Sequence, residues 1–146
     1  MYENRVENII DTIIESVRNQ QILLKHLPDY RITNEEMNKE FKTMQFKFPR
    51  KFGNTTIAVE LLKRLKNSTL WYPTKFWSDV IKKEKVDDDN LDNKKDLKSR
   101  IKYLKDSQII GTKYEIVIID NTSWISTEKL SEIYKKLFCD TIILIG

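Results

Sequence analysis

The sequence predicts an α/β fold with three layers and a mainly parallel central sheet. Two observations support this prediction. Segments with helical periodicity alternate with short apolar segments along the chain. The two most hydrophobic segments, residues 114–120 and 141–145, are rich in β-branched residues, as expected for strands buried on both faces. The chain has 146 residues, of which 40% are hydrophobic, and this is enough for one domain with a sizeable core.

Residues 1–43 predict a helical extension that precedes an α/β core of residues 44–146. Pro28 ends a long helix expected over residues 3–25, and Thr33 with Glu36 forms a capping-box pattern for a short helix through about Phe41. An apolar stripe runs along the long helix: Val6, Ile9, Ile10, Ile13, Ile14 and Val17. This stripe has two interpretations, because it can cover one face of the sheet or form a homodimer or another partner contact.

Within the core, strands and helices are expected to alternate. The expected strands are residues 44–48, 69–72, 108–110, 114–120 and 141–145. The expected helices are residues 55–66, 74–83 with Thr74 as cap, 97–105, and a helix through about residue 138 capped by Ser126 or Thr127. Residues 82–98 are mostly charged and predict a solvated loop or insert. Four aspartates in or near it (Asp87, Asp88, Asp89 and Asp92) lack the glycine and closing glutamate of a calcium loop.

Composition excludes several functional classes. His26 is the single histidine and Cys139 the single cysteine, which argues against a zinc site or a disulfide framework and favours a reducing, cytoplasmic location. No stretch approaches 18 apolar residues, and charged residues precede the first apolar run, so neither a membrane span nor a signal peptide is expected. The net charge of +4 permits an anionic partner without requiring one.

Residues 48–55 partly match the phosphate-loop pattern G-x-x-x-x-G-K-[ST]. Such a loop joins a strand to a helix, and its N–H groups bind an anion. Gly53 and Thr55 fit the pattern, whereas Phe48 replaces the first glycine and Asn54 replaces the lysine. The candidate cofactor-binding residues are Arg50, Lys51, Gly53, Asn54, Thr55, Thr56, Asp120 and Asn121. A glycine before a threonine-capped helix is also common outside such loops, so the pattern alone is weak.

Residues 44–146 resemble the first part of the ATPase core of superfamily 2 helicases and phage large terminases. The order of segments matches: QFKFPRKFGNTTIAVELLKRL, then TLWYPT, YEIVIIDN and TIILIG. Arg50 matches the arginine of the terminase form R-x-x-G-K-T. The resemblance implies bound ATP-Mg²⁺, with Thr55 and Asp120 as the residues that hold the metal.

Two departures from the family pattern affect catalysis. The loop lysine balances phosphate charge in the transition state, which neutral Asn54 cannot do. The family has a glutamate after the strand aspartate, and Asn121 in that position cannot accept a proton from water. We therefore expect no catalytic residues and a catalytically impaired ATPase-like module. The alternative is an active but atypical Mg²⁺-dependent NTPase linked to DNA or RNA handling, in which Arg50 or Lys51 supplies the missing charge.

The impaired module is expected to act through a protein or nucleic-acid partner. The sequence is rich in isoleucine, lysine and asparagine, a bias common in AT-rich genomes including many phages, so a phage or mobile-element accessory protein in the host cytoplasm is the expectation. The candidate nucleic-acid contacts are Lys75, Trp77, Lys98, Arg100 and Lys102. Aromatic residues near the strand ends (Trp71, Tyr72, Phe76, Trp77 and Trp124) have two interpretations, because they can stack on bases or pack in the core.

Overall fold

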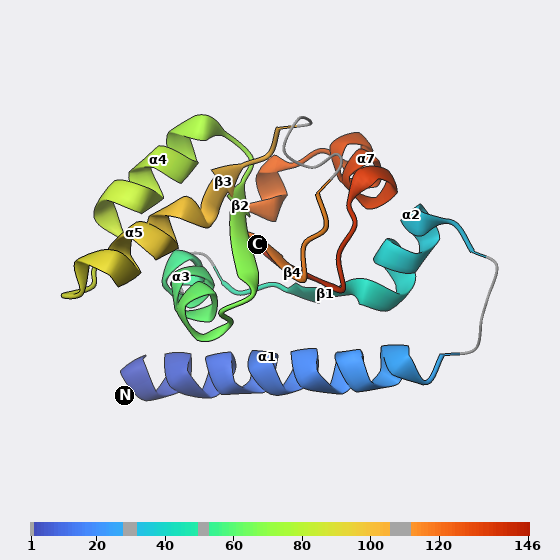
Figure 1. Cartoon of the computed structure of the whole chain (residues 1–146), viewed down its shortest axis with the longest axis horizontal. Coiled ribbons are helices and arrows are strands. Elements are labelled where there is room, and N and C mark those ends of the chain that lie inside the picture. The colour runs from blue at the N-terminus through green and yellow to red at the C-terminus, as the bar shows by residue number, and fades with distance from the viewer. Residues whose placement is uncertain (1, 28–31, 50–52, 106–111) are drawn as a thin grey trace.

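A computed structural model describes residues 2–27, 32–49, 53–105 and 112–146. Five parallel strands form one sheet in the order β1-β5-β4-β2-β3 (Figure 1). Their bounds are β1 Thr43–Phe46, β2 Ser68–Tyr72, β3 Ile101–Tyr103, β4 Ile116–Ile119 and β5 Thr141–Ile145. The predicted α/β class and parallel sheet are therefore confirmed. The strand predicted over residues 108–110 lies outside the described residues.

The central strands β4 and β5 are buried along their whole length. In their register Ile118 pairs with Ile143 and Ile119 with Leu144, so branched apolar side chains pack on both faces of the sheet. Helices must cover both faces of such a sheet, because neither face can be left to water. This requirement explains why the two sequences are continuously hydrophobic rather than alternating.

The helices lie on both faces of the sheet. Helices α1 (Tyr2–Lys25), α3 (Asn54–Arg64), α4 (Lys75–Glu84) and α5 (Leu91–Ser99) contribute to one hydrophobic cluster with the sheet. Helix α7 (Thr127–Lys136) packs in a second cluster with the other side chains of β4 and β5. Helix α3 connects β1 to β2, and helix α7 connects β4 to β5. In the strand order these two connections run in opposite directions across the sheet. Since crossovers between parallel strands are right-handed, these two helices must cover opposite faces.

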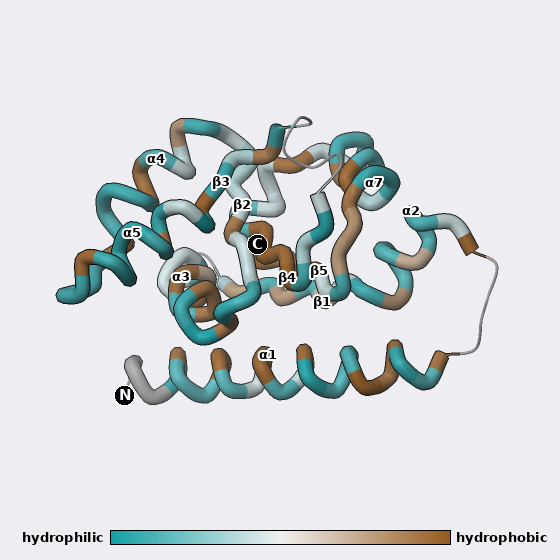
Figure 2. The backbone as a smooth tube through the Cα atoms, viewed as in Figure 1, coloured by the Kyte–Doolittle hydropathy of each residue, from teal (hydrophilic) through white to brown (hydrophobic). Residues whose placement is uncertain are grey.

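The apolar stripe of α1 packs against the rest of the chain. Val6, Ile10, Ile13 and Val17 are buried, and Figure 2 shows hydrophobic segments recurring along this helix. Arg64 of α3 also forms ion pairs with Glu7 and Asp11 of α1. The first interpretation of the stripe, that it covers one face of the fold, is confirmed. A homodimer through α1 stays a prediction, and it would have to use other surfaces of the helix.

Residues 34–42, the second part of the helical extension, pack against α7. Thr33 caps the short helix α2 (Asn34–Glu36), as predicted, and a π-helix, η1, continues it over Met37–Lys42. The side-chain nitrogen of buried Asn38 donates hydrogen bonds to the carbonyls of Tyr134 and Leu137 at the end of α7, at 2.7 and 2.8 Å. These bonds satisfy carbonyls that a helix C-terminus leaves without partners.

Three boundaries predicted from the sequence are wrong. Residues 82–98 are not an irregular loop, because α4 extends to Glu84 and α5 occupies Leu91–Ser99, with the Asn90 side chain capping α5. The helix predicted over residues 97–105 is replaced by the end of α5 and by strand β3, since Ile101 pairs beside Leu70 in the sheet. The first strand is Thr43–Phe46 rather than 44–48, which leaves exposed Lys47 beyond its end.

Candidate functional site

The carboxyl ends of three strands converge on Thr55 and Asp120. Helix α3 begins after β1, Asp120 follows directly after β4, and Gly146 follows β5, which lies between those two strands. Oγ1 of Thr55 donates to Oδ2 of Asp120 over 3.4 Å. Ligands of open α/β sheets bind at this edge, near the place where successive connections leave in opposite directions. The sequence placed both residues in one site, and the structure brings them together.

Asp120 is fully buried, with 0% of its surface exposed. Its carboxylate accepts three hydrogen bonds: from the Tyr72 hydroxyl at 2.9 Å, from the Thr55 hydroxyl, and from the backbone N–H of Asn121 at 2.8 Å. Burial raises the pKa of Asp120, and the three donors oppose that rise because they stabilise the charged form. The carboxylate is therefore held in one orientation by donors from three elements of the fold.

The contact between Tyr72 and Asp120 is one that the sequence did not predict. The register of β2 and β4 pairs Trp71 with Ile119, which places the next residues, Tyr72 and Asp120, side by side. Burial and the neighbouring carboxylate raise the pKa of Tyr72, so its hydroxyl remains a donor at neutral pH. A tyrosine that ends a strand gives no signal of its partner, because strand register is a tertiary property.

Gly53 forms the turn into α3. Its φ of 96° lies in the left-handed region that favours glycine, and no side chain caps this helix. The backbone N–H groups of Asn54, Thr55 and Thr56 have no partner within the helix, because its first bond runs from Ile57 N to Gly53 O. Helix N-termini of this kind attract anions. The Asn54 Oδ1 atom is buried and accepts no hydrogen bond from the described residues.

The segment after β4 turns sharply at Asn121. This residue has φ 56° and ψ 40°, a left-handed conformation, and the 3-10 turn η2 (Thr122–Trp124) follows it. The turn packs closely on the end of β5, because a Cβ atom added at Gly146 would lie 2.1 Å from Oγ1 of Thr122. The end of β5 is therefore in direct contact with the turn that holds Asn121 and Trp124.

A cavity of about 580 Å³ opens at this edge. Its lining residues are Phe48, Gly53, Asn54, Thr55, Thr56, Lys85, Asn121, Ser123, Trp124 and Gly146. Among these described side chains, Lys85 is the charged one, and buried Asp120 is in hydrogen-bond contact with the lining residue Thr55. A volume of this size suits a small ligand. Helix N–H groups and a lysine side chain, with no aspartate or glutamate among the described lining residues, favour an anion.

The predicted cofactor-binding residues divide into two groups. Gly53, Asn54, Thr55, Thr56 and Asn121 line this cavity, with Asp120 directly beneath. Arg50 and Lys51 lie outside the described residues. As for metal, Mg²⁺ is usually bound through one or two carboxylates together with phosphate oxygens and water. Asp120 and the Thr55 hydroxyl match such a set chemically, although the carboxylate already accepts three protein hydrogen bonds.

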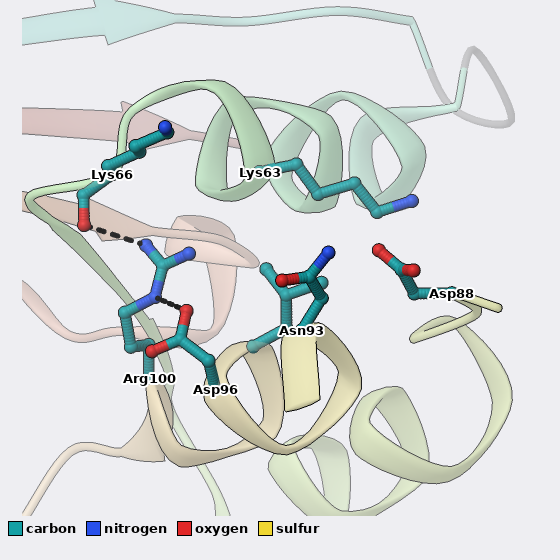
Figure 3. A pocket seen from close by; sticks show the side chains of 7 residues that line it. Lys63, Lys66, Asp88, Asn93, Asp96 and Arg100 are labelled. Carbon is teal, nitrogen blue, oxygen red and sulfur yellow. Dashed lines mark hydrogen bonds and ion pairs between the residues drawn. The ribbon is translucent and has the colours of Figure 1, made fainter. Parts of the chain in front are cut away.

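Arg100 has a structural position that the sequence did not predict. Its guanidinium donates to the carbonyls of Leu62, Leu65, Lys66 and Ser68, at the end of α3 and the start of β2, at 3.0–3.3 Å. A further bond joins it to Asp96 at 3.2 Å (Figure 3). The nearby pocket, lined by Lys63, Lys66, Asp88 and Asn93 among others, carries both signs of charge. The sequence predicted Arg100 as a nucleic-acid contact. In the structure its guanidinium forms these hydrogen bonds within the fold instead.

The other nucleic-acid candidates lie on three elements of the fold. Lys75 is exposed and Trp77 half-buried at the start of α4, whereas Lys98 lies on α5 and Lys102 on β3. Trp77 joins an aromatic group: its ring contacts Phe76 at 5.6 Å and Trp124 at 6.4 Å between centroids. Phe76 and Trp124 are 67% and 68% exposed. Trp71 and Tyr72, in contrast, are core residues.

The described residues contain neither a candidate metal cluster nor a candidate membrane helix. No group of three or more histidine, cysteine, aspartate or glutamate side chains in those residues could hold a metal ion. No helix in the same part of the chain combines the length and apolarity needed to cross a membrane. No protein-family model matches the chain, and no curated protein sequence matches it.

Proposed function

We propose that this protein is a P-loop-like module that binds the phosphates of a nucleotide and does not hydrolyse it. One observation carries the proposal: Thr55 at the start of α3 and buried Asp120 after β4 lie within 3.4 Å, at the carboxyl edge of a parallel sheet. The family that the sequence resembles binds ATP-Mg²⁺ with residues of these types in these positions. The helix N-terminus supplies N–H donors, and Mg²⁺, when bound, would neutralise phosphate charge.

Hydrolysis is the step that this site is poorly equipped to perform. Asn54 precedes Thr55 and Asn121 follows Asp120 in the sequence, both line the cavity, and neither carries a charge. Asn54 cannot balance charge as the γ-phosphoryl group leaves, and Asn121 cannot take a proton from the attacking water. Each loss is expected to slow turnover by about 10²–10³-fold. The buried carboxylate of Asp120 is committed to three donors, so it is also unsuited to act as the base.

The binding step is tested by titration calorimetry with ATP and ADP, with and without Mg²⁺. Thr55→Val removes the hydroxyl and keeps the shape, and it is expected to weaken Mg²⁺-nucleotide binding about tenfold or more. The matched control is Thr12→Val, because Thr12 is an exposed threonine of α1 that bonds its own helix. If the wild-type protein binds neither nucleotide at millimolar concentration, or if the two variants bind equally, the proposal is wrong.

A phosphate-release assay decides between the proposal and the alternative of an active, atypical NTPase. We expect no release above the buffer rate. Release that disappears in Asp120→Asn would establish the alternative and overturn the impaired module. The test needs no assumption about Arg50 or Lys51, whose positions are not described.

The module is expected to act through a partner, either a protein or a nucleic acid. The exposed aromatic ring of Phe76, next to Lys75 in sequence, favours single-stranded nucleic acid, because such rings stack on bases without sequence preference. A salt-dependent mobility shift of labelled single-stranded DNA, weakened by Phe76→Ala, would support this partner. Absence of any shift at low salt would favour a protein partner instead.

A further inference from the structure

Two side chains of the cavity, Lys85 and Trp124, are exposed. Lys85 follows the last residue of α4, and its neighbours Ile81 and Val86 are buried. These buried neighbours fix the position of its backbone. The side chain is exposed, and within the described residues no ion pair involves its ammonium group. It lines the same cavity as Gly53, Asn54 and Thr55.

Trp124 is the other exposed group, and tryptophan is highly buried on average in folded proteins. It is 68% exposed, yet its position is fixed: its backbone N–H bonds Asn121 O at 2.9 Å and its ring contacts Trp77. The 3-10 turn that carries it packs on the end of β5. A rigid ring at the rim of a cavity can stack on a planar group of a ligand without losing much conformational freedom.

The cavity therefore presents two different kinds of contact to one ligand. Helix N–H groups and the Lys85 ammonium suit phosphate oxygens, and the Trp124 ring suits an aromatic base. No aspartate or glutamate side chain lies among the described lining residues to repel an anion. In the phosphate-loop pattern a lysine precedes Thr55, and here that residue is Asn54. A phosphate bound at the start of α3 therefore receives no positive charge from residue 54.

We propose that Lys85 and Trp124 supply the contacts that the loop has lost, Lys85 neutralising the phosphates and Trp124 stacking on the base of a bound nucleotide. This assignment rests on the proposed function, nucleotide binding. It adds two residues, Lys85 and Trp124, as those that contact the nucleotide's phosphates and base. Lys85 follows α4, whereas Gly53, Asn54 and Thr55 form the start of α3, so its cation is provided by a different part of the fold. Trp124 makes the site selective for nucleotides over bare polyphosphates.

Calorimetry with ATP and with tripolyphosphate separates the two roles. Lys85→Met is expected to weaken both ligands by roughly 10- to 100-fold, because both carry the phosphates. Lys83→Met is the matched control, since Lys83 is an exposed lysine of the same helix that does not line the cavity. Trp124→Ala is expected to weaken ATP by about tenfold and to leave tripolyphosphate unchanged, whereas Trp124→Phe retains most of the ATP affinity.

Each outcome decides a different statement. If Lys85→Met and Lys83→Met bind alike, or if Trp124→Ala affects both ligands equally, the assignment is overturned while the proposed nucleotide site stands. If wild-type protein binds neither ATP nor tripolyphosphate, both proposals fail. Thermal unfolding of every variant accompanies the titrations, and because both side chains are exposed, each midpoint is expected to stay near that of the wild type.

Discussion

The hydroxyl of Tyr72 donates a 2.9 Å hydrogen bond to Oδ2 of Asp120, and both residues are fully buried. They stand one position beyond the paired residues Trp71 and Ile119, so this bond continues the pairing of β2 and β4 through side chains. Each group alone would be costly to bury, because a carboxylate or a phenol removed from water needs a partner. Together they hold the carboxylate that faces Thr55.

Removing that partner with Tyr72→Phe is expected to lower the free energy of unfolding by about 1–3 kcal/mol. The ring keeps its packing, so the loss comes from a buried charged acceptor with one donor fewer. Denaturant unfolding measures the change. Tyr103→Phe is the control, because Tyr103 is a half-buried strand tyrosine of β3. A loss no greater than that of the control would show that the bond contributes nothing to stability.

Because the pKa of Asp120 is raised in the folded protein, its contribution to the free energy of unfolding is expected to depend on pH. The folded protein holds a proton on Asp120 at pH values where the unfolded chain has already lost it, because burial outweighs the three donors. Stability from this residue is therefore fully present below the ordinary aspartate pKa of about 3.9, and it is lost as pH rises to the raised folded value. The Asp120→Asn variant should lack this pH-dependent contribution, because asparagine does not titrate.

Denaturant unfolding of wild type and Asp120→Asn across pH 4–8 isolates the effect, because the other carboxylates are common to both proteins. We expect the difference in unfolding free energy to move in favour of the variant as pH rises through that window. A difference that does not change with pH would mean that Asp120 has the same pKa in the folded and unfolded states.

The elements predicted well were those whose signals are local. The runs of β-branched residues at 116–119 and 141–145 identified the central strands, and Thr33, Thr74 and Ser126 cap helices as predicted. Helix α5 was missed because its mostly charged sequence has one fully buried residue, Leu97, and so little periodicity. The capping signal at Asn90 was available and would have located its start.

The candidate site was only partly predictable for a related reason. Thr55 and Asp120 could be paired because a loop motif and an acidic strand end are both readable along the chain. Tyr72, Lys85 and Trp124 reach the same edge through strand register, the length of α4 and a left-handed turn at Asn121. None of these features leaves a pattern in the sequence.

Arg100 is predicted to stabilise the fold rather than to bind a partner. Arg100→Met retains the apolar stem and removes the donors to four carbonyls, and it is expected to cost about 2–3 kcal/mol of unfolding free energy. Lys98→Met, two residues before Arg100 on α5, is expected to stay within about 0.5 kcal/mol of wild type. Equal stability of the two variants, with reduced DNA binding in Arg100→Met alone, would restore Arg100 as a nucleic-acid contact.

The left-handed backbone of Asn121 limits which side chains can replace it. With φ at 56°, Asn121→Gly is expected to leave stability unchanged or slightly higher, while Asn121→Glu is expected to lower it by about 1–2 kcal/mol. A glutamate here would supply the group that polarises water in the ATPases that the sequence resembles, yet it would strain this turn. Asn54→Lys carries no such strain, since residue 54 is helical, and it should raise nucleotide affinity.

Combining Asn54→Lys with Asn121→Glu therefore tests whether the present backbone can accept the catalytic pair. Calorimetry is expected to show tighter ATP binding in the double variant, with unfolding free energy close to that of Asn121→Glu alone because the two effects are separate. If affinity does not rise, the start of α3 is not in a phosphate-binding conformation. If Asn121→Glu is as stable as Asn121→Gly, the left-handed turn relaxes, and the asparagine is not retained for backbone reasons.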